Sequence, residues 1–345
     1  MAQITLLHWN IYQFSNNKLR NGNGAALINY IAQVISQSQA NIVALLELKN
    51  SAVNNIMARL IPAINLAKDQ GPPAENRWRF IGINSQKNNE AYIVLYQLGN
   101  DFVPLNAAFT TNHINGLTDN RLSLFGVPEG QLPFNSSLTA RGGRKPYYVV
   151  FRTTDGSPAR NFSVVLYHTM FGVHSPAGVR NVGLLAQSRA ILDQGVTLEM
   201  AASLTCGDFN VDFNPLDPGP YHNLLVTLPS KQSTNEKTSL VNFTPPDGFP
   251  DSAQYRKNAY DNIFRYNRAK PPDTVGGTVV DLIKESTTSP PGTAFMVDEA
   301  RPFKTGPILD GELIQHIPPQ GFEDAWHLVR HAISDHLPVY VNYTI

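Results

Sequence analysis

Residues 204–210 read LTCGDFN, a short apolar run that ends in polar side chains. The apolar part predicts a strand over residues 204–209, followed by a polar loop. A strand end holds its side chains rigidly at the edge of a sheet, which suits catalytic or binding groups. Asp208 and Asn210 are therefore candidate functional residues. An Asx turn, with a purely structural role, is the alternative interpretation.

The same pattern of an apolar strand bordered by polar side chains occurs at four other places. The polar residues are Asn10 after residues 6–9, Glu47 after residues 42–46, His168 after residues 164–167, and Asp335 with His336 before residues 337–339. Each has a structural alternative, because carboxylates often cap turns and lone histidines are often satisfied core residues. Taken together, the five places predict one site assembled from several strand ends.

Strand and helix patterns alternate along the whole chain. Further strands are expected at residues 3–11, 42–48, 78–83, 91–98, 147–153, 162–168, 259–266 and 337–343, and helices at 25–38, 53–66 and 180–198. Residues 106–143 and 270–330 predict long loops. Since no repeat or linker divides the chain, we expect a single α/β domain over residues 1–345 with these two loops.

Composition bounds the function further. Lys plus Arg is 27 and Asp plus Glu is 27, so attraction to nucleic acid must come from a local basic patch. The single Cys206 excludes an intramolecular disulfide and a cysteine-based zinc site. No apolar run approaches the roughly 20 residues of a membrane span, and residues 1–10 resemble a first strand and not a signal peptide. We expect a soluble protein with no stable protein partner, in the cytoplasm or secreted after loss of a signal peptide.

The candidate residues supply two kinds of chemistry. Oxygen ligands from Glu47, Asp335 and Asn10 suit a Mg²⁺ ion, with Mn²⁺ or Ca²⁺ as alternatives. His168 and His336 are suited to move protons near neutral pH.

Acidic partners for these histidines are available at strand edges, at Glu90 and Asp261. Phosphodiester cleavage needs a cation for the developing phosphoryl charge, an activated water and a donor for the leaving oxygen. The chain carries this set of groups.

Five motifs in chain order resemble the endonuclease/exonuclease/phosphatase superfamily, which includes deoxyribonuclease I. They are WNI at 9–11, LLE at 45–47, GDFN at 207–210, YDNIF at 260–264 and SDHLPV at 334–339. The resemblance implies a four-layer sandwich of two mixed β-sheets flanked by helices.

The resemblance also implies a role for each matching residue. Glu47 would bind Mg²⁺, with Asn10 and Asp335 close to the ion or its waters. His336, oriented by Asp261, would assist the attacking water, Asp208 and Asn210 would position that water and the phosphate, and His168 would contact the phosphate or protonate the leaving group.

Two further matches resemble the deoxyribonuclease I branch. Glu90 looks like the acidic partner of its first catalytic histidine, and Arg144 like its phosphate-contacting arginine, with Lys49 also able to reach a nucleic-acid backbone. A solvated loop charge is the alternative for Arg144. The branch's disulfides cannot form, and Tyr12 stands where abasic-site endonucleases often have an acidic residue, which disfavours abasic-site repair.

The sequence therefore predicts a Mg²⁺-dependent phosphodiesterase, with a DNA endonuclease as the leading hypothesis. A phosphoesterase acting on a phospholipid, sphingolipid or small phosphate ester is the main alternative. A binding protein that has kept the fold and lost catalysis is a third, disfavoured because every expected catalytic position is filled.

Overall fold

A computed structural model of the chain describes most of the expected strands and helices. The described residues are 2–20, 24–67, 78–84, 89–104, 144, 147–154, 159–172, 175–187, 200–214, 216–217, 219–227, 231–240, 256–267, 276–280, 282 and 329–345. All of the expected loop at 106–143 lies outside them, as does most of the loop at 270–330. The expectation of one domain over the full chain stays a prediction.

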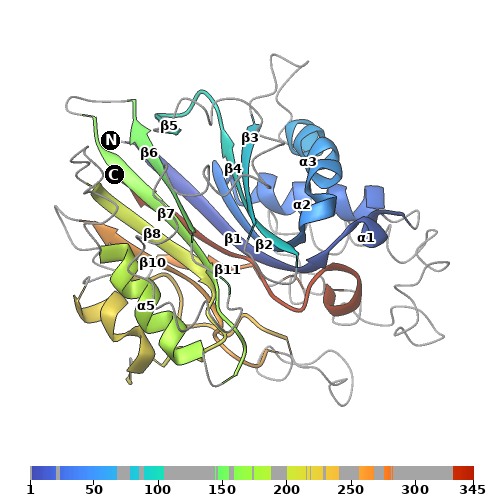
Figure 1. Cartoon of the computed structure of the whole chain (residues 1–345). Coiled ribbons are helices and arrows are strands. Elements are labelled where there is room, and N and C mark those ends of the chain that lie inside the picture. The colour runs from blue at the N-terminus through green and yellow to red at the C-terminus, as the bar shows by residue number, and fades with distance from the viewer. Residues whose placement is uncertain are drawn as a thin grey trace.

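Two mixed sheets, each of six described strands, form the centre of the molecule (Figure 1). The first has the order β11-β12-β1-β2-β4-β3, and the second has the order β5-β6-β7-β8-β10-β9. The strands of the first sheet are β1 (Gln3–Phe14), β2 (Ile42–Lys49), β3 (Trp78–Asn84), β4 (Glu90–Gln97), β11 (Gly277–Val279) and β12 (Val339–Thr344). Those of the second are β5 (Phe102–Pro104), β6 (Tyr147–Thr153), β7 (Asn161–His168), β8 (Met200–Asp208), β9 (Lys231–Gln232) and β10 (Asp261–Asn267).

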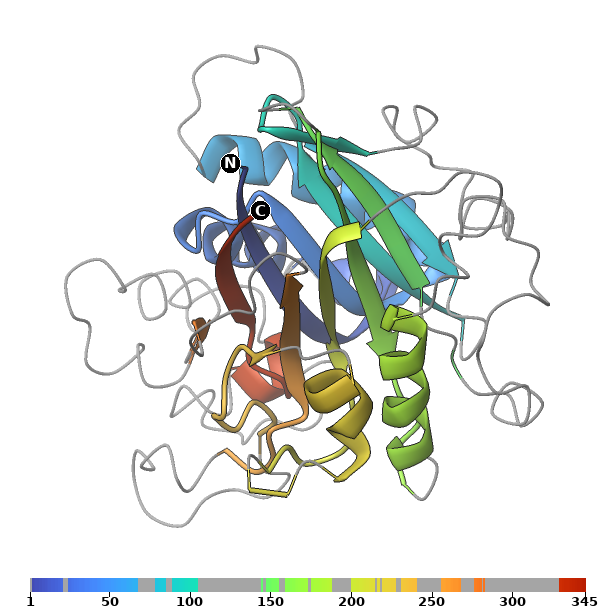
Figure 2. The same ribbon diagram turned by 90° about the vertical axis from the view of Figure 1, so that its left-hand side faces the viewer.

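Helices cover the outer faces of both sheets, as Figures 1 and 2 show from two directions. On the side of the first sheet lie α1 (Asn16–Arg20), α2 (Gly24–Gln37) and α3 (Val53–Ala67), and on the side of the second lies α5 (Ser175–Gln187). The buried residues of α3 recur at helical spacing, which gives the helix one apolar face. The resulting order of layers, helix–sheet–sheet–helix, confirms the four-layer sandwich expected from the sequence.

Aromatic side chains pack where the two sheets face each other. The ring of Tyr96 on β4 lies 5.7 Å from that of Phe151 on β6, edge to face. Phe151 also stacks on Phe162 of β7 at 5.3 Å. Edge-to-face and offset-stacked geometries are those that aromatic pairs prefer. These contacts join the sheets away from the strand ends that carry the candidate site.

Strand direction and register bring distant polar residues to the same edge of the sandwich. In the second sheet β7 and β8 are parallel with His168 opposite Asp208, while β10 is antiparallel to β8 with Asp261 opposite Asp208. In the first sheet β1 and β2 are parallel, with Asn10 opposite Leu46. Parallel neighbours end at the same edge of a sheet, so these ends lie together.

The observed elements differ from the expected ones in a few places. The helix expected at 180–198 begins earlier, at Ser175, and is described to Gln187. A short strand, β11, lies inside the expected loop at 270–330, where it pairs with β12. A strand of three residues, such as β11, is too short to show a periodicity that could be recognised without its partner strand. Among the described residues, no helix combines the length and apolarity needed to cross a membrane.

Candidate active site

Asn10 connects the two sheets at the centre of the site. It is fully buried on β1, and its side-chain amide donates to Glu47 Oε1 at 3.1 Å and to Asp208 Oδ2 at 3.0 Å. These two carboxylates come from different sheets. The Oδ1 atom of Asn10 is buried and has no hydrogen-bond partner within the described residues. An unpaired buried acceptor beside two carboxylates fits a position that a cation would complete.

Glu47 projects from an irregular part of β2. Its φ of 62° lies in the left-handed region, which is costly for a residue other than glycine, and the pairing of β2 with β4 shifts between Leu45 and Leu48. The backbone N–H of Gln13 donates to Glu47 Oε2 at 3.2 Å. Burial raises the pKa of Glu47, and the neighbouring carboxylate of Glu90 adds to the rise. Backbone strain of this kind is concentrated at functional sites.

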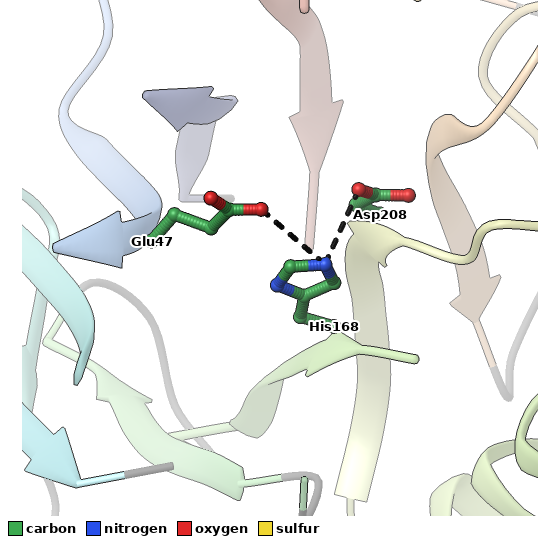
Figure 3. Close-up of side chains that lie close together, drawn as sticks. All are labelled: Glu47, His168 and Asp208. Carbon is green, nitrogen blue, oxygen red and sulfur yellow. Dashed lines mark ion pairs between the residues drawn. The ribbon is translucent and has the colours of Figure 1, made fainter. Parts of the chain in front are cut away.

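His168, at the end of β7, lies between the carboxylates of the two sheets (Figure 3). Its Nε2 is 3.5 Å from Glu47 Oε1 and 3.4 Å from Asp208 Oδ2. Burial lowers the pKa of His168 well below its ordinary value, and the positive charges of Arg144 and His336 lower it further. At neutral pH its imidazole is therefore uncharged and has one N–H to donate.

Asp208 ends β8 and is contacted from several sides. Its Oδ1 accepts the backbone N–H of Asn210 at 2.9 Å, which is the Asx turn considered from the sequence. Asn210 has a φ of 48°, and its amide nitrogen donates to the Thr169 carbonyl at 3.2 Å. Burial raises the pKa of Asp208 to about 7, although the charge of His336 opposes the rise. The structural and functional interpretations of this loop are compatible, because the turn orients the carboxylate.

His336 and Asp261 form a tight buried pair. His336 Nδ1 lies 2.6 Å from Asp261 Oδ2, and its Nε2 lies 3.7 Å from Asp208 Oδ2. Burial by itself lowers the pKa of His336, but the charges of Asp261, Asp208 and Asp335 raise it well above its ordinary value. For Asp261 the signs are reversed. Burial by itself raises its pKa, but the charge and the hydrogen bond of His336 lower it below its ordinary value. The pair is an imidazolium and a carboxylate.

A second group of predicted residues is centred on Glu90, which lies beside His168 and is contacted by Arg144 and Lys49. Arg144 donates twice to the Glu90 carboxylate, at 2.7 and 3.1 Å, and Lys49 Nζ lies 3.9 Å from Glu90 Oε1. His168 Nδ1 is 3.8 Å from Glu90 Oε2, within ion-pair distance and beyond hydrogen-bond distance. Arg144 also donates to the Thr169 carbonyl at 3.2 Å. Arg144 is therefore a partly buried ion-pair partner and not a solvated loop charge.

Asp335 stands at the border of the cluster. Its Oδ1 lies 3.8 Å from His336 Nε2, and its Oδ2 lies 3.9 Å from Arg330 Nη1. Oδ1 is buried and has no hydrogen-bond partner among the described residues. Burial raises the pKa of Tyr12, and the charges of Asp335 and Glu47 raise it further, so the two carboxylates act on the same phenol.

The donor set of the site fits a divalent cation. Among the described residues, two groups of three side chains have ligand atoms within 4.8 Å of one another. The first is Glu47, His168 and Asp208, and the second is Asp208, Asp261 and His336. Asn10 Oδ1 and Asp335 Oδ1, buried acceptors with no hydrogen-bond partner in the described part of the chain, add to this set. Carboxylate and amide oxygens are ligands that Mg²⁺ prefers.

Three of the described residues in or beside the site were not identified from the sequence. His8 Nε2 lies 3.3 Å from Asp261 Oδ1, and Thr238 Oγ1 donates to Asp261 Oδ2 at 2.9 Å. Lys18 is buried and donates to the Tyr12 carbonyl at 2.5 Å. A signal existed only for His8, because alternation along a strand puts it on the same face as Asn10.

Comparison with known proteins supports the fold. No protein-family model matches the sequence, and no curated protein sequence matches it. Among solved structures, an endonuclease/exonuclease/phosphatase family protein from Bacteroides thetaiotaomicron is similar, with a TM-score of 0.51, 14% identity, and coverage of 99% of this chain and 97% of that chain. An endonuclease/exonuclease/phosphatase from Bacteroides vulgatus has a TM-score of 0.50 and 14% identity, with both chains covered completely.

The chain therefore has the fold of the endonuclease/exonuclease/phosphatase proteins. This agrees with the five motifs that suggested it from the sequence.

Proposed function

We propose that this chain is a divalent-metal-dependent phosphoesterase that cleaves phosphodiester bonds, with DNA as its substrate and Mg²⁺ as its ion. One observation carries the proposal. Asp208 lies between two histidines whose pKa values are displaced in opposite directions, 3.4 Å from His168 and 3.7 Å from His336. Neighbouring titratable groups with pKa values pushed apart are typical of acid–base active sites.

The residues that would hold the ion are Glu47, Asn10 and Asp335, with the Asp208 carboxylate beside them. When bound, the ion supplies positive charge for the phosphoryl oxygens and for the leaving oxygen. Mn²⁺ or Ca²⁺ would satisfy the same oxygen ligands.

Proton transfer and phosphate binding fall to Asp208 and the two histidines beside it. Asp208 is the group placed to accept the proton of the attacking water, because burial raises the pKa of its carboxyl and the Asn210 turn keeps it oriented. His336 carries a positive charge that Asp261 stabilises, so it binds a phosphoryl oxygen and assists the same water through Asp208. His168, uncharged, has an N–H for the phosphate or the leaving oxygen. The sequence assigned proton transfer to the two histidines alone, and the pKa of Asp208 adds a third participant.

The test is incubation with supercoiled plasmid in Mg²⁺, with and without EDTA. The Glu47→Ala variant removes the proposed metal ligand. Asp101→Ala is the matched control, because Asp101 is an exposed carboxylate beside β5, at the sheet end remote from His168. The proposal is supported if nicking requires metal, is lost in Glu47→Ala and persists in Asp101→Ala. An intact plasmid under Mg²⁺, Mn²⁺ and Ca²⁺ would exclude a DNA endonuclease.

A second candidate is a phosphoesterase for a small phosphate ester, phospholipid or sphingolipid. It is favoured by the charges near the site, since Arg144 and Lys49 both face Glu90 and the chain has no net charge. A polyanion gains less from cations that already have a carboxylate partner. Hydrolysis of p-nitrophenyl phosphate, bis-p-nitrophenyl phosphate, phosphatidylcholine or sphingomyelin, dependent on metal and on Glu47, would support this candidate if plasmid stays intact.

A further inference from the structure

His8 occupies a buried polar position that none of the sequence motifs assigns. It lies on β1 two residues before Asn10, and its exposed fraction is 0%. Residues two apart on a strand share a face, so His8 and Asn10 both point toward the polar cluster. His8 Nε2 lies 3.3 Å from Asp261 Oδ1. A histidine from the first sheet thus contacts the carboxylate that holds His336.

The Asp261 carboxylate is held through both of its oxygens. Oδ2 accepts from His336 Nδ1 at 2.6 Å and from Thr238 Oγ1 at 2.9 Å. Oδ1 accepts from His8, its only hydrogen-bond donor among the described residues. The χ2 torsion of an aspartate is broad, so a hydrogen bond at the second oxygen further restricts rotation of the carboxylate.

The environment of His8 fixes which ring nitrogen carries the proton. An ionised carboxylate only accepts hydrogen bonds, so the proton is on Nε2. The Nδ1 atom is buried and has no hydrogen-bond partner in the part of the chain that the structure describes. Packing alone gives no reason for this arrangement, because an apolar side chain would fill the space without an unpaired polar atom.

We propose that His8 is a positioning residue for the Asp261–His336 pair. By donating to Oδ1, it holds the Asp261 carboxylate in the orientation that presents Oδ2 to His336 Nδ1. The His336 ring then keeps Nε2 directed toward Asp208. The structural part of this inference stands on geometry alone, and its catalytic consequence rests on the proposed function.

Three substitutions at His8 separate the effect of the hydrogen bond from the effect of packing. His8→Gln keeps a donor, because Nε2 is the same number of bonds from Cβ in both side chains. His8→Leu removes the donor, and His8→Met, whose unbranched side chain adapts to irregular spaces, replaces it if the leucine variant does not fold. Circular dichroism and thermal melting establish that each variant is folded.

The first measurement does not depend on activity. In metal-free protein labelled with ¹⁵N-histidine, the His336 Nδ1–H that bonds to Asp261 should give a downfield proton signal protected from exchange, assigned by its absence in His336→Ala. We expect this signal to persist in His8→Gln and to broaden or disappear in the leucine or methionine variant. An unchanged signal in a folded donor-less variant would overturn the inference and leave His8 a core residue.

The second measurement is kinetic, on whichever phosphoester the protein hydrolyses. We expect a kcat lower by about 10- to 100-fold in the donor-less variant with an unchanged KM, and recovery in His8→Gln. Equal kcat values in all variants would refute the catalytic consequence. If the protein hydrolyses none of the substrates but shows the predicted NMR changes, the proposed function is refuted and the positioning role stands.

Discussion

Gly207 lies where the two parallel strands that carry His168 and Asp208 run close together. A Cβ at this position would stand 1.8 Å from the Tyr167 carbonyl oxygen and 2.8 Å from its carbonyl carbon. Real Cβ atoms essentially never come within 3.0 Å of another heavy atom in this way. Gly207→Ala must therefore push β7 and β8 apart by roughly 1.2 Å, against backbone and not against a flexible side chain.

The loss of stability follows from the hydrogen bonds between β7 and β8 that this shift would break. Tyr167 pairs with Gly207 and His168 pairs with Asp208, and the Thr169 N–H donates to the Asp208 carbonyl at 3.0 Å just beyond them. Each buried backbone group left without its partner costs about 1–3 kcal/mol. Overpacking adds about 1–3 kcal/mol. With one such group and the overpacking, we expect the free energy of unfolding to fall by about 2–6 kcal/mol, a large part of the roughly 5–15 kcal/mol of a typical domain.

Urea unfolding followed by circular dichroism measures this loss. The matched control is Gly99→Ala, because Gly99 has a φ of +81° but a Cβ there would meet no atom within 4 Å. Its expected cost is about 1–2 kcal/mol, from the left-handed backbone alone. If Gly207→Ala costs no more than Gly99→Ala, β7 and β8 do not approach each other this closely at Gly207, and the reasoning is refuted. Activity per folded molecule should also drop in Gly207→Ala, since the shift displaces His168 from Asp208.

Three further predictions concern single side chains. His168→Ala and His336→Ala should each lower the initial rate of hydrolysis by about 10²- to 10⁴-fold with an unchanged circular dichroism spectrum. A rate within a few-fold of that of the native protein would show that the replaced residue has no part in proton transfer or phosphate binding. Arg144→Met should lower the free energy of unfolding by about 3 kcal/mol, because the buried Glu90 carboxylate loses both guanidinium hydrogen bonds and keeps Lys49, 3.9 Å away, as its neighbouring cation. Urea unfolding should show recovery when Glu90→Gln is added. Burial lowers the pKa of Lys18 to about 8, so its ammonium group loses a proton at a lower pH in the folded protein than in the unfolded chain. The stability of the native protein relative to Lys18→Met should therefore rise between about pH 8 and pH 10, by up to about 1.4 kcal/mol per pH unit, and parallel pH profiles of the two would contradict this.

Much of the fold was predictable because its elements carry strong local patterns. The strands that became β1, β2, β4, β7 and β8 are apolar runs bordered by polar residues, and α2 and α3 have clear apolar stripes. Helix limits were less predictable, as α5 shows by beginning at Ser175. The short strand β11 was missed because its order comes from pairing with β12 and not from its own residues.

The candidate site was predictable to the extent that its residues border apolar strand patterns, although β1 continues past Asn10 to Phe14 and His336 stands before β12. Asn10, Glu47, His168, Asp208 and His336 stood out for this reason, and the structure brings them into one connected group. Their individual roles remain predictions that the variants above test.

The sequence by itself determined the residue types of the site, the strands that end in them and the resemblance that implied the fold. Only the tertiary structure decided which atoms meet. It paired Arg144 with Glu90, and it put His8 on the second oxygen of a carboxylate 253 positions away along the chain. Such pairings depend on strand order, register and the contact between the two sheets. These are set by the packing of the whole sandwich, so no local pattern of residues carries them.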